Sequence, residues 1–258
     1  NDIATGAPLT MFIQNKDHRS KDYSLFRKVH RPSHIDYPAI LRYGESVDLR
    51  GSGIFSGRLT APIVMAGGVA KTILRDYGVK IGAFVSRIGE VHDTSAYNVE
   101  EIKSNVEKNL VRTVDQTLAK DMLKKVEEVK AEEDSIGGTV SVVVEGYPKG
   151  IGDPWFYSLE SQLSAGMFSI PAVKGVEFGS GFSAAQMKGS EHNDPYVFDE
   201  KENTVSTKTN NNGGIIGGIS IGTPITFNVA VKPTSSIGKS QKTLNFKTKE
   251  MTELKIQG

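Results

Sequence analysis

The sequence contains no cysteine and only one tryptophan among its 258 residues. Without cysteine there are no disulfide bonds, no zinc–thiolate sites and no cysteine nucleophile. This composition fits a reducing compartment, so we expect a cytoplasmic protein. No apolar run reaches the roughly 18 residues that a membrane span needs. The 31 Lys and Arg nearly cancel the 30 Asp and Glu, so any anion site must be local, and neither nucleic acid nor an anionic membrane is an expected partner.

The length and the 38 % hydrophobic content allow a large core without a metal or a disulfide. Apolar periodicity predicts helices over 60–77, over 99–134 with a break near 113–115, and over 153–168. It predicts strands over 81–88, 139–145, 176–178, 215–221 and 225–231. Because helices and strands are mixed without strict alternation, we expect an α+β fold with a single domain over residues 1–258.

Other segments carry weaker patterns. Apolar residues at 9–13 and the alternation over 244–247 each resemble a strand, and their places near the two ends suggest a fragment of a longer protein. Residues 15–59 are polar and glycine-rich, which predicts a long loop. Gly67 and Gly68 interrupt a predicted helix and suggest close packing against another backbone.

Positive charge gathers in that loop. Residues 16–50 hold eight Lys or Arg against five Asp or Glu, and three of the five histidines. Arg50 and Arg58 flank a glycine-rich stretch over 51–57, and arginine forks together with glycine backbone can hold a phosphate or carboxylate. The stretch lacks the Lys-Ser/Thr of a P-loop and the spacing of G-x-G-x-x-G. An anion site and an ordinary surface loop therefore both stay open.

His34 is the candidate acid or base, because imidazole titrates near neutral pH and Asp36 or Arg31 could hold the ring. A purely structural histidine is the alternative. His92 and His192 lie outside any such cluster, and we interpret both as non-catalytic. No metal-binding histidine pattern occurs, so we expect no metal.

Two further segments combine glycine or lysine with apolar strands. The glycine pairs within 213–222 suggest close approach of a backbone or a flat ligand, with tight strand packing as the alternative. Lys232 and the hydroxyls of residues 234–236 could hold a phosphate at a strand end, with a plain turn as the alternative.

These motifs, taken in order, resemble the chorismate synthase family over nearly the whole chain. The matching segments are 15–23, 31–36, 50–58, 66–74, 148–154, 169–175, 213–222 and 232–237.

The resemblance implies a β-α-β sandwich and a homotetramer. It also implies a lyase of aromatic amino-acid biosynthesis, which converts 5-enolpyruvylshikimate 3-phosphate to chorismate by 1,4-anti elimination of phosphate. The implied cofactor is reduced FMN, and bifunctional relatives reduce their flavin with NADPH. The substrate would be a small molecule with a phosphate and two carboxylates.

The resemblance also implies roles for individual residues at the positions where the motifs match. The resemblance implies that His34 protonates the reduced flavin and that Arg19, Arg31 and Arg58 bind the substrate. The implied FMN contacts are Ile54, Phe55, Ser56, Pro171, Ala172, Gly217, Lys232, Pro233, Thr234, Ser235 and Ser236.

Three departures stand out. Many members have Arg-Ser-Ser where this chain has Ile54-Phe55-Ser56, which removes one cation near the flavin. The family's N-terminal segment with a second catalytic histidine is absent, and the Gly-Arg-His-Asp-Pro motif stops at Gly258. An inactive flavin- or anion-binding core fragment, and a structural assembly module that uses its Gly–Ile strands, are therefore the rival hypotheses.

Overall fold

The computed structural model describes residues 6–14, 25–44, 46–201 and 203–256. Contacts between backbones divide the chain into two compact units. Unit 1 holds residues 1–72 and 242–254, and unit 2 holds residues 73–241 and 255–258. We describe each unit by itself, and the single domain stays a prediction.

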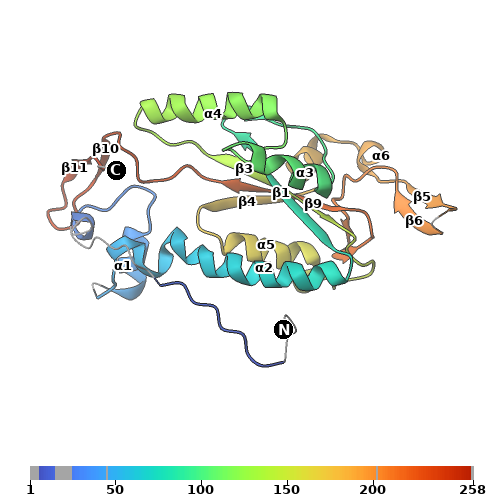
Figure 1. The fold of residues 1–258 in the computed structure, drawn as a ribbon. Coiled ribbons are helices and arrows are strands. Elements are labelled where there is room, and N and C mark those ends of the chain that lie inside the picture. Colours follow the sequence, from blue (N-terminus) through green and yellow to red (C-terminus); the bar gives the residue numbers. More distant parts are fainter. Residues whose placement is uncertain (1–5, 15–24, 45, 202, 257–258) are drawn as a thin grey trace. The chain divides into compact units, whose positions relative to one another are not determined.

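Unit 2 is built on a five-stranded antiparallel sheet (Figure 1). Its strand order is β2-β1-β3-β9-β4. The strands are β1 (Lys80–Ile88), β2 (Val91–His92), β3 (Gly138–Glu145), β9 (Ile225–Val231) and β4 (Val173–Phe178). The patterns over 81–88, 139–145, 176–178 and 225–231 predicted four of these, and the mixture of helices with antiparallel strands confirms the α+β class.

One face of the sheet carries the main core. Ile225, Phe227 and Val229 of β9 are all buried, because residues at a spacing of two share one face of a strand. They pack with Val144 of β3 and with helix α5 (Leu159–Phe168), which lies along this face in Figure 1.

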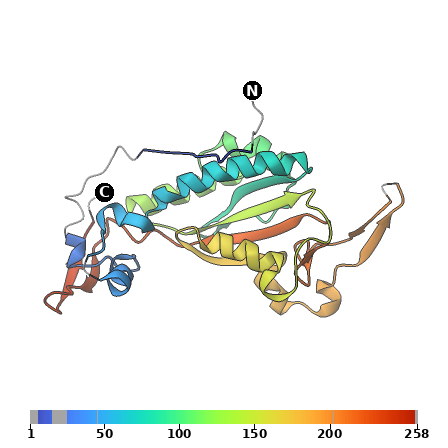
Figure 2. The ribbon, with the colours of Figure 1, turned by 90° about the horizontal axis from the view of Figure 1, so that it is seen from below.

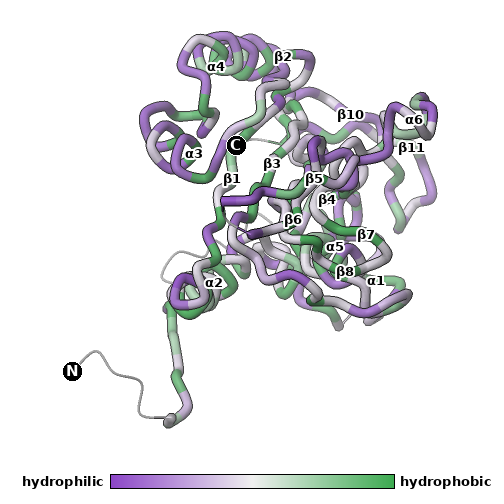
Figure 3. Tube along the Cα trace, turned by 90° about the vertical axis from the view of Figure 1, so that its right-hand side faces the viewer, coloured by the Kyte–Doolittle hydropathy of each residue, from purple (hydrophilic) through white to green (hydrophobic). Residues whose placement is uncertain are grey.

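The opposite face is covered on its β1 side by α3 (Val99–Asn105) and α4 (Gln116–Ala131). Phe84 and Val143 pack there against Val99 and Ile102. Much of the outer path of α4 is hydrophilic in Figure 3, as expected for a helix with one buried stripe. The break predicted near 113–115 is correct, since Asp115 caps α4 by accepting from the backbone N–H groups of residues 117 and 118.

Two predictions in unit 2 need correction. Residues 215–221 form a hairpin of β7 (Ile215–Ile216) and β8 (Ile219–Ser220), because Gly217 (φ 62°) and Gly218 (φ 89°) turn the chain back. Residues 153–168 are not one helix. The 3₁₀ turn η6 (Trp155–Tyr157) comes first, and α5 starts only after Ser158, whose hydroxyl accepts from the N–H of Ser161.

A ribbon of β5 (Tyr196–Asp199) and β6 (Thr204–Thr207) follows the short helix α6 (Gly189–His192). It extends away from the five-stranded sheet in Figures 1 and 2. Its cross-strand pairs place Tyr196, Phe198 and Val205 on one exposed face.

Unit 1 is mostly helical. It contains η2 (Leu25–Arg27), α1 (Asp36–Tyr43), η3 (Arg50–Phe55) and η4 (Gly57–Leu59). α2 (Thr60–Asp76) starts in unit 1 and ends in unit 2. The hairpin of β10 (Gln241–Leu244) and β11 (Met251–Leu254) belongs to unit 1 except for Gln241.

The helix predicted over 60–77 is confirmed, whereas the loop predicted over 15–59 is wrong where α1 lies. The strands predicted at 9–13 and 244–247 are wrong, since residues 8–14 form no regular element and the chain turns after Leu244. The close packing predicted at Gly67 and Gly68 is not found among the described residues: apart from the sequence neighbours and the backbone of α2 itself, no atom lies within 4 Å of a Cβ built at either. Across the described residues, none of the helices is both long and apolar enough to cross a bilayer.

Candidate active site

The candidate site in unit 1 centres on Asp36, the first residue of α1. Its side chain is fully buried (0 % exposed), and both carboxylate oxygens accept from Arg31. Arg31 Nε donates to Oδ2 and Nη2 to Oδ1, each at 2.9 Å, and the backbone N–H of Arg31 donates to Oδ2 at 3.2 Å. This two-point pairing ties the turn before α1 to the helix start.

His34 lies on the same carboxylate. Its Nδ1 is 2.8 Å from Asp36 Oδ1, and its side chain is 16 % exposed. Burial by itself would raise the pKa of Asp36, but the hydrogen bonds and charges of Arg31 and His34 outweigh burial and hold that pKa well below its usual range. Asp36 is therefore an anion that accepts hydrogen bonds from both neighbours.

The side chain of Arg31 is more buried than expected for an arginine that is open to substrate. Its side chain is 6 % exposed, and its guanidinium carbon lies 4.2 Å from the ring centre of Phe26. The predicted substrate contact is thus a buried cation whose fork is directed at Asp36.

The other ring nitrogen of His34 faces the glycine-rich stretch. Nε2 lies 3.4 Å from Ser52 Oγ. Gly51, Ser52 and Gly53 all have positive φ angles of 59°, 65° and 50°, which curls this segment back toward the histidine.

Arg58 belongs to the same turn. A Cβ built on Gly51 would lie 3.5 Å from Nη2 of Arg58, so the guanidinium of Arg58 lies against the Gly51 backbone. The structure therefore places His34 and Arg58 against residues 51 and 52, and Arg31 shares the Asp36 carboxylate with His34. Arg19 lies outside the described residues.

Three predicted flavin contacts, Ile54, Phe55 and Ser56, come directly after Gly53 in the sequence. Ile54 is exposed (68 %), Phe55 lies 6.0 Å from the ring of Tyr43 between centroids, and Ser56 Oγ accepts from the N–H of Arg58. Ser56 thus caps the turn that leads into α2.

The back of the site is an aromatic layer that sequence analysis missed. His30 is buried and stacks on Phe246 at 4.1 Å between ring centres, and Tyr37 lies 4.7 Å from the same ring. Burial lowers the pKa of His30, and the charge of Asp36 opposes this. Thr243 Oγ1 donates to the backbone carbonyl of His30, and the N–H of Phe246 donates to the backbone carbonyl of Lys28. The hairpin of residues 241–254 thus supports the turn that carries His34.

The remaining predicted residues lie in unit 2. The N–H of Lys232 donates to the carbonyl of Ala172 at 2.9 Å, so the structure brings these two predicted contacts together. Ala172 has a φ of 71°, which turns the chain after Pro171 into β4. Ser135 Oγ donates to the carbonyl of Thr234 at 2.7 Å.

The segment 232–236 is therefore fixed at both ends. A Cβ on Gly137 would meet Pro233 at 3.0 Å, and Gln241 donates to the carbonyl of Ser235. Ser236 is half-buried within this segment.

Gly217 lies elsewhere in unit 2. The backbone carbonyl of its neighbour Gly218 accepts from the N–H of Leu159, the first residue of α5. Ala172 instead comes after the end of that helix in the sequence. Gly217 therefore lies near the end of α5 opposite to the end that leads to Ala172.

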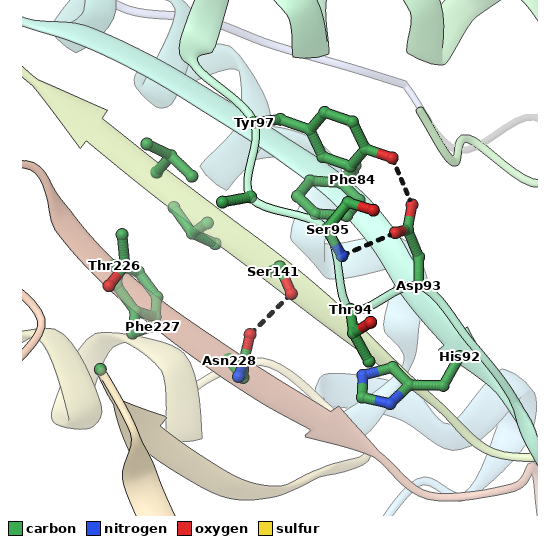
Figure 4. Close-up of a pocket in the computed structure, with 14 residues that line it drawn as sticks. Phe84, His92, Asp93, Thr94, Ser95, Tyr97, Ser141, Thr226, Phe227 and Asn228 are labelled. Carbon is green, nitrogen blue, oxygen red and sulfur yellow. Dashed lines mark hydrogen bonds between the residues drawn. The ribbon is translucent and has the colours of Figure 1, made fainter. Parts of the chain in front are cut away.

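A cavity lies on the sheet face of unit 2 beside α3, and none of the predicted residues line it. This cavity of about 350 Å³ is lined by the loop 92–97 and by β3 and β9 (Figure 4). Asp93 is buried and accepts from Tyr97 Oη at 2.9 Å and from the N–H of Ser95 at 3.0 Å.

A chain of polar side chains crosses its floor. Ser141 is 2.7 Å from Ser86 and 2.6 Å from Asn228 Oδ1, and Asn228 Nδ2 donates to Glu177 at 3.1 Å. These four residues come from four strands, so only the sheet register could have revealed them. Within the described ranges, no group of three or more His, Asp or Glu is placed to bind a metal ion.

Comparison with known proteins identifies the family. The sequence profile described as "Chorismate synthase" matches residues 1–258. Chorismate synthases of Methanosarcina acetivorans and Dehalococcoides mccartyi are 45 % and 41 % identical over 99 % and 100 % of this chain. The chain spans 69 % and 70 % of their lengths.

A solved structure titled "Crystal Structure of Chorismate Synthase" aligns with a TM-score of 0.71 at 30 % identity, over 78 % of this chain and 64 % of that chain. This likeness confirms the predicted type of fold. By its sequence over all 258 residues and by its fold, the chain belongs to the chorismate synthase family.

Proposed function

We propose that the protein is a lyase of aromatic amino-acid biosynthesis that eliminates phosphate from 5-enolpyruvylshikimate 3-phosphate to give chorismate. The observation that carries the proposal is the imidazole of His34, held by the buried carboxylate of Asp36 in a chain of this family. A histidine oriented by an ionised carboxylate is a suitable proton carrier.

The proposed cofactor is reduced FMN. Its phosphate and ribityl end need a cation and hydroxyl donors, and Lys232, Thr234, Ser235 and Ser236 supply that set on a segment fixed at both ends. The donor set therefore fits an anionic ligand. When bound, reduced FMN supplies electron density to the substrate ring and takes up the proton lost from it.

The residues of unit 1 have distinct proposed roles. Asp36 accepts from Nδ1 of His34, which leaves Nε2 as the nitrogen that can deliver a proton. Arg58, on the exposed turn, is the proposed contact of the substrate phosphate. Arg31 is proposed to act mainly by keeping Asp36 ionised, because its fork already donates to that carboxylate. Arg19 is proposed as a further anion contact.

The remaining family properties are proposed as a group: a homotetramer, a cytoplasmic location, a small-molecule substrate and, as in bifunctional relatives, flavin reduction by NADPH.

The test is anaerobic release of phosphate from the substrate by the protein with reduced FMN. We expect release by the wild type and a loss of about 10²–10⁴-fold in turnover for His34→Ala. His192→Ala is the matched control, since His192 lies in α6 and is none of the proposed site residues, and it should keep turnover. A folded wild type that binds FMN but releases no phosphate would contradict the proposal.

Titration of the same protein with FMN separates the rivals. Tight binding without turnover supports the inactive flavin-binding core. No flavin affinity, with oligomers that persist without ligand, supports the assembly module.

A further inference from the structure

We propose that Ser52 is a positioning residue for His34: its hydroxyl is the second hydrogen-bond partner of the imidazole and completes a chain Asp36–His34–Ser52. The inference deepens the proposed function, because it concerns the same histidine. It rests on two observations in unit 1, the contact with Nε2 and the backbone conformation of Ser52.

The contact assigns a task to each ring nitrogen. Asp36 is ionised and can only accept, so Nδ1 carries a hydrogen and donates to Oδ1 at 2.8 Å. Nε2 is then the nitrogen that gains and loses a proton, and Ser52 Oγ lies 3.4 Å from it. A hydroxyl can donate to neutral Nε2 and accept from protonated Nε2, so Ser52 can remain a partner in both states.

The second observation is that Ser52 adopts a conformation that favours glycine. Its φ and ψ are 65° and 7°, and it stands between Gly51 and Gly53, which are also left-handed. A Cβ on Gly53 would lie 2.5 Å from the carbonyl oxygen of Asp48, so position 53 requires glycine in this conformation. Glycine at position 52 would populate this region freely. The backbone at position 52 would therefore be less strained with glycine, yet the chain has a serine there. Backbone strain of this kind is typical of functional sites.

The charged groups around the pair are Arg31 and Asp36 on the turn and helix that carry His34, and Arg58 against Gly51 on the segment that carries Ser52. The ion pair between Arg31 and Asp36 does not involve the Ser52 hydroxyl, so we expect it to persist when that hydroxyl is removed. A change seen at Nε2 can therefore be assigned to that hydroxyl.

Two variants separate the hydroxyl from the backbone. Ser52→Gly and Ser52→Ala both remove the hydroxyl, but only Ser52→Gly removes the unfavourable left-handed Cβ. We expect Ser52→Gly to raise the unfolding temperature by about 2–4 °C and Ser52→Ala not to raise it. Ser46→Ala is the control, because it removes a serine hydroxyl that donates to the carbonyl of Tyr43 rather than contacting His34.

The decisive readout is the imidazole itself. Long-range ¹H–¹⁵N spectra of the protein without substrate or flavin should show the Nε2 resonance of His34 moved equally in Ser52→Gly and Ser52→Ala. The Nδ1 resonance and the Ser46→Ala spectrum should stay as in the wild type. An unmoved Nε2 resonance in either Ser52 variant would overturn the proposal, whatever the protein catalyses.

Turnover supplies the second readout. Loss of one hydrogen bond to His34 should lower kcat by about 2–10-fold with KM unchanged, in both Ser52 variants. An Nε2 shift with unchanged kcat would overturn the positioning role. Absence of turnover in the wild type would instead refute the proposed function, and the spectra would still decide the role of Ser52.

Discussion

Arg31 donates to both carboxylate oxygens of Asp36, each at 2.9 Å, and both side chains are withdrawn from solvent. His34 shares one of those oxygens. One buried anion therefore determines the place of both a cation and the imidazole. Disturbing it should affect stability and the histidine together.

Asp36→Asn keeps the shape of the side chain but removes the charge and replaces one acceptor with an NH₂ group. Because this leaves Arg31 buried without its anion, we expect a loss of about 3–5 kcal/mol in the free energy of unfolding, measured in urea. Asp48→Asn is the matched control, since its ion pair with Arg50 is exposed, and its effect should be far smaller. Equal losses in the two variants would contradict the buried-anion interpretation.

Asp194 should make unit 2 sensitive to acid. Burial would raise its pKa, but hydrogen bonds from Thr209, Asn211 and Asn212 lower it to about 2. The carboxylate of Asp194 therefore binds a proton less readily in the folded state than in the unfolded state. The stability that Asp194 contributes, about 1–2 kcal/mol, is complete above about pH 4 and is lost as the pH falls through 2. Unfolding curves between pH 5 and pH 2 should show this slope in the wild type and a shallower one in Asp194→Asn.

Gly67 and Gly68 lie in the middle of α2 with open space at both Cβ positions. Each Gly→Ala change should raise the free energy of unfolding by about 0.5–1 kcal/mol, as at exposed helix positions. Calorimetry measures this directly. If either change instead weakens the assembly of the protein, seen by sedimentation without loss of helix content, then a second backbone does pack on these glycines.

The polar chain below the sheet-face cavity should be cooperative. Asn228→Leu removes the partner that Ser141 and Glu177 share. Because Ser141 keeps Ser86 and Glu177 keeps the N–H of Phe182, we expect a total loss of about 1–3 kcal/mol in the free energy of unfolding. In the double variant Asn228→Leu/Ser141→Ala, the loss should be smaller than the sum of the single losses. Strict additivity of the unfolding free energies would show that the two side chains are uncoupled.

Long apolar patterns predicted the sheet well. β9 alternates from Ile225 to Val231, and its inward residues are buried as that pattern requires. α1 was missed because it is short and begins with a buried aspartate that serves as the anchor of Arg31 rather than as an apolar face. The hairpin 215–220 was missed because two turn glycines lie within one apolar run.

The site was predictable only where its residues are neighbours in sequence. Arg31, His34 and Asp36 lie within one turn, so their contact could be expected. Ser52 is 18 positions from His34, and only the left-handed curl of residues 51–53 brings it close. The aromatic layer and the sheet-face cavity depend on long-range pairing, which periodicity does not report.

Thr243 reaches back across 213 positions to the carbonyl of His30, next to the loop that holds the proposed proton carrier. During synthesis on the ribosome, that loop is made 213 positions ahead of the residue in the hairpin that supports it. A nascent chain would thus complete this support only after all five strands of the sheet in unit 2 have been synthesised.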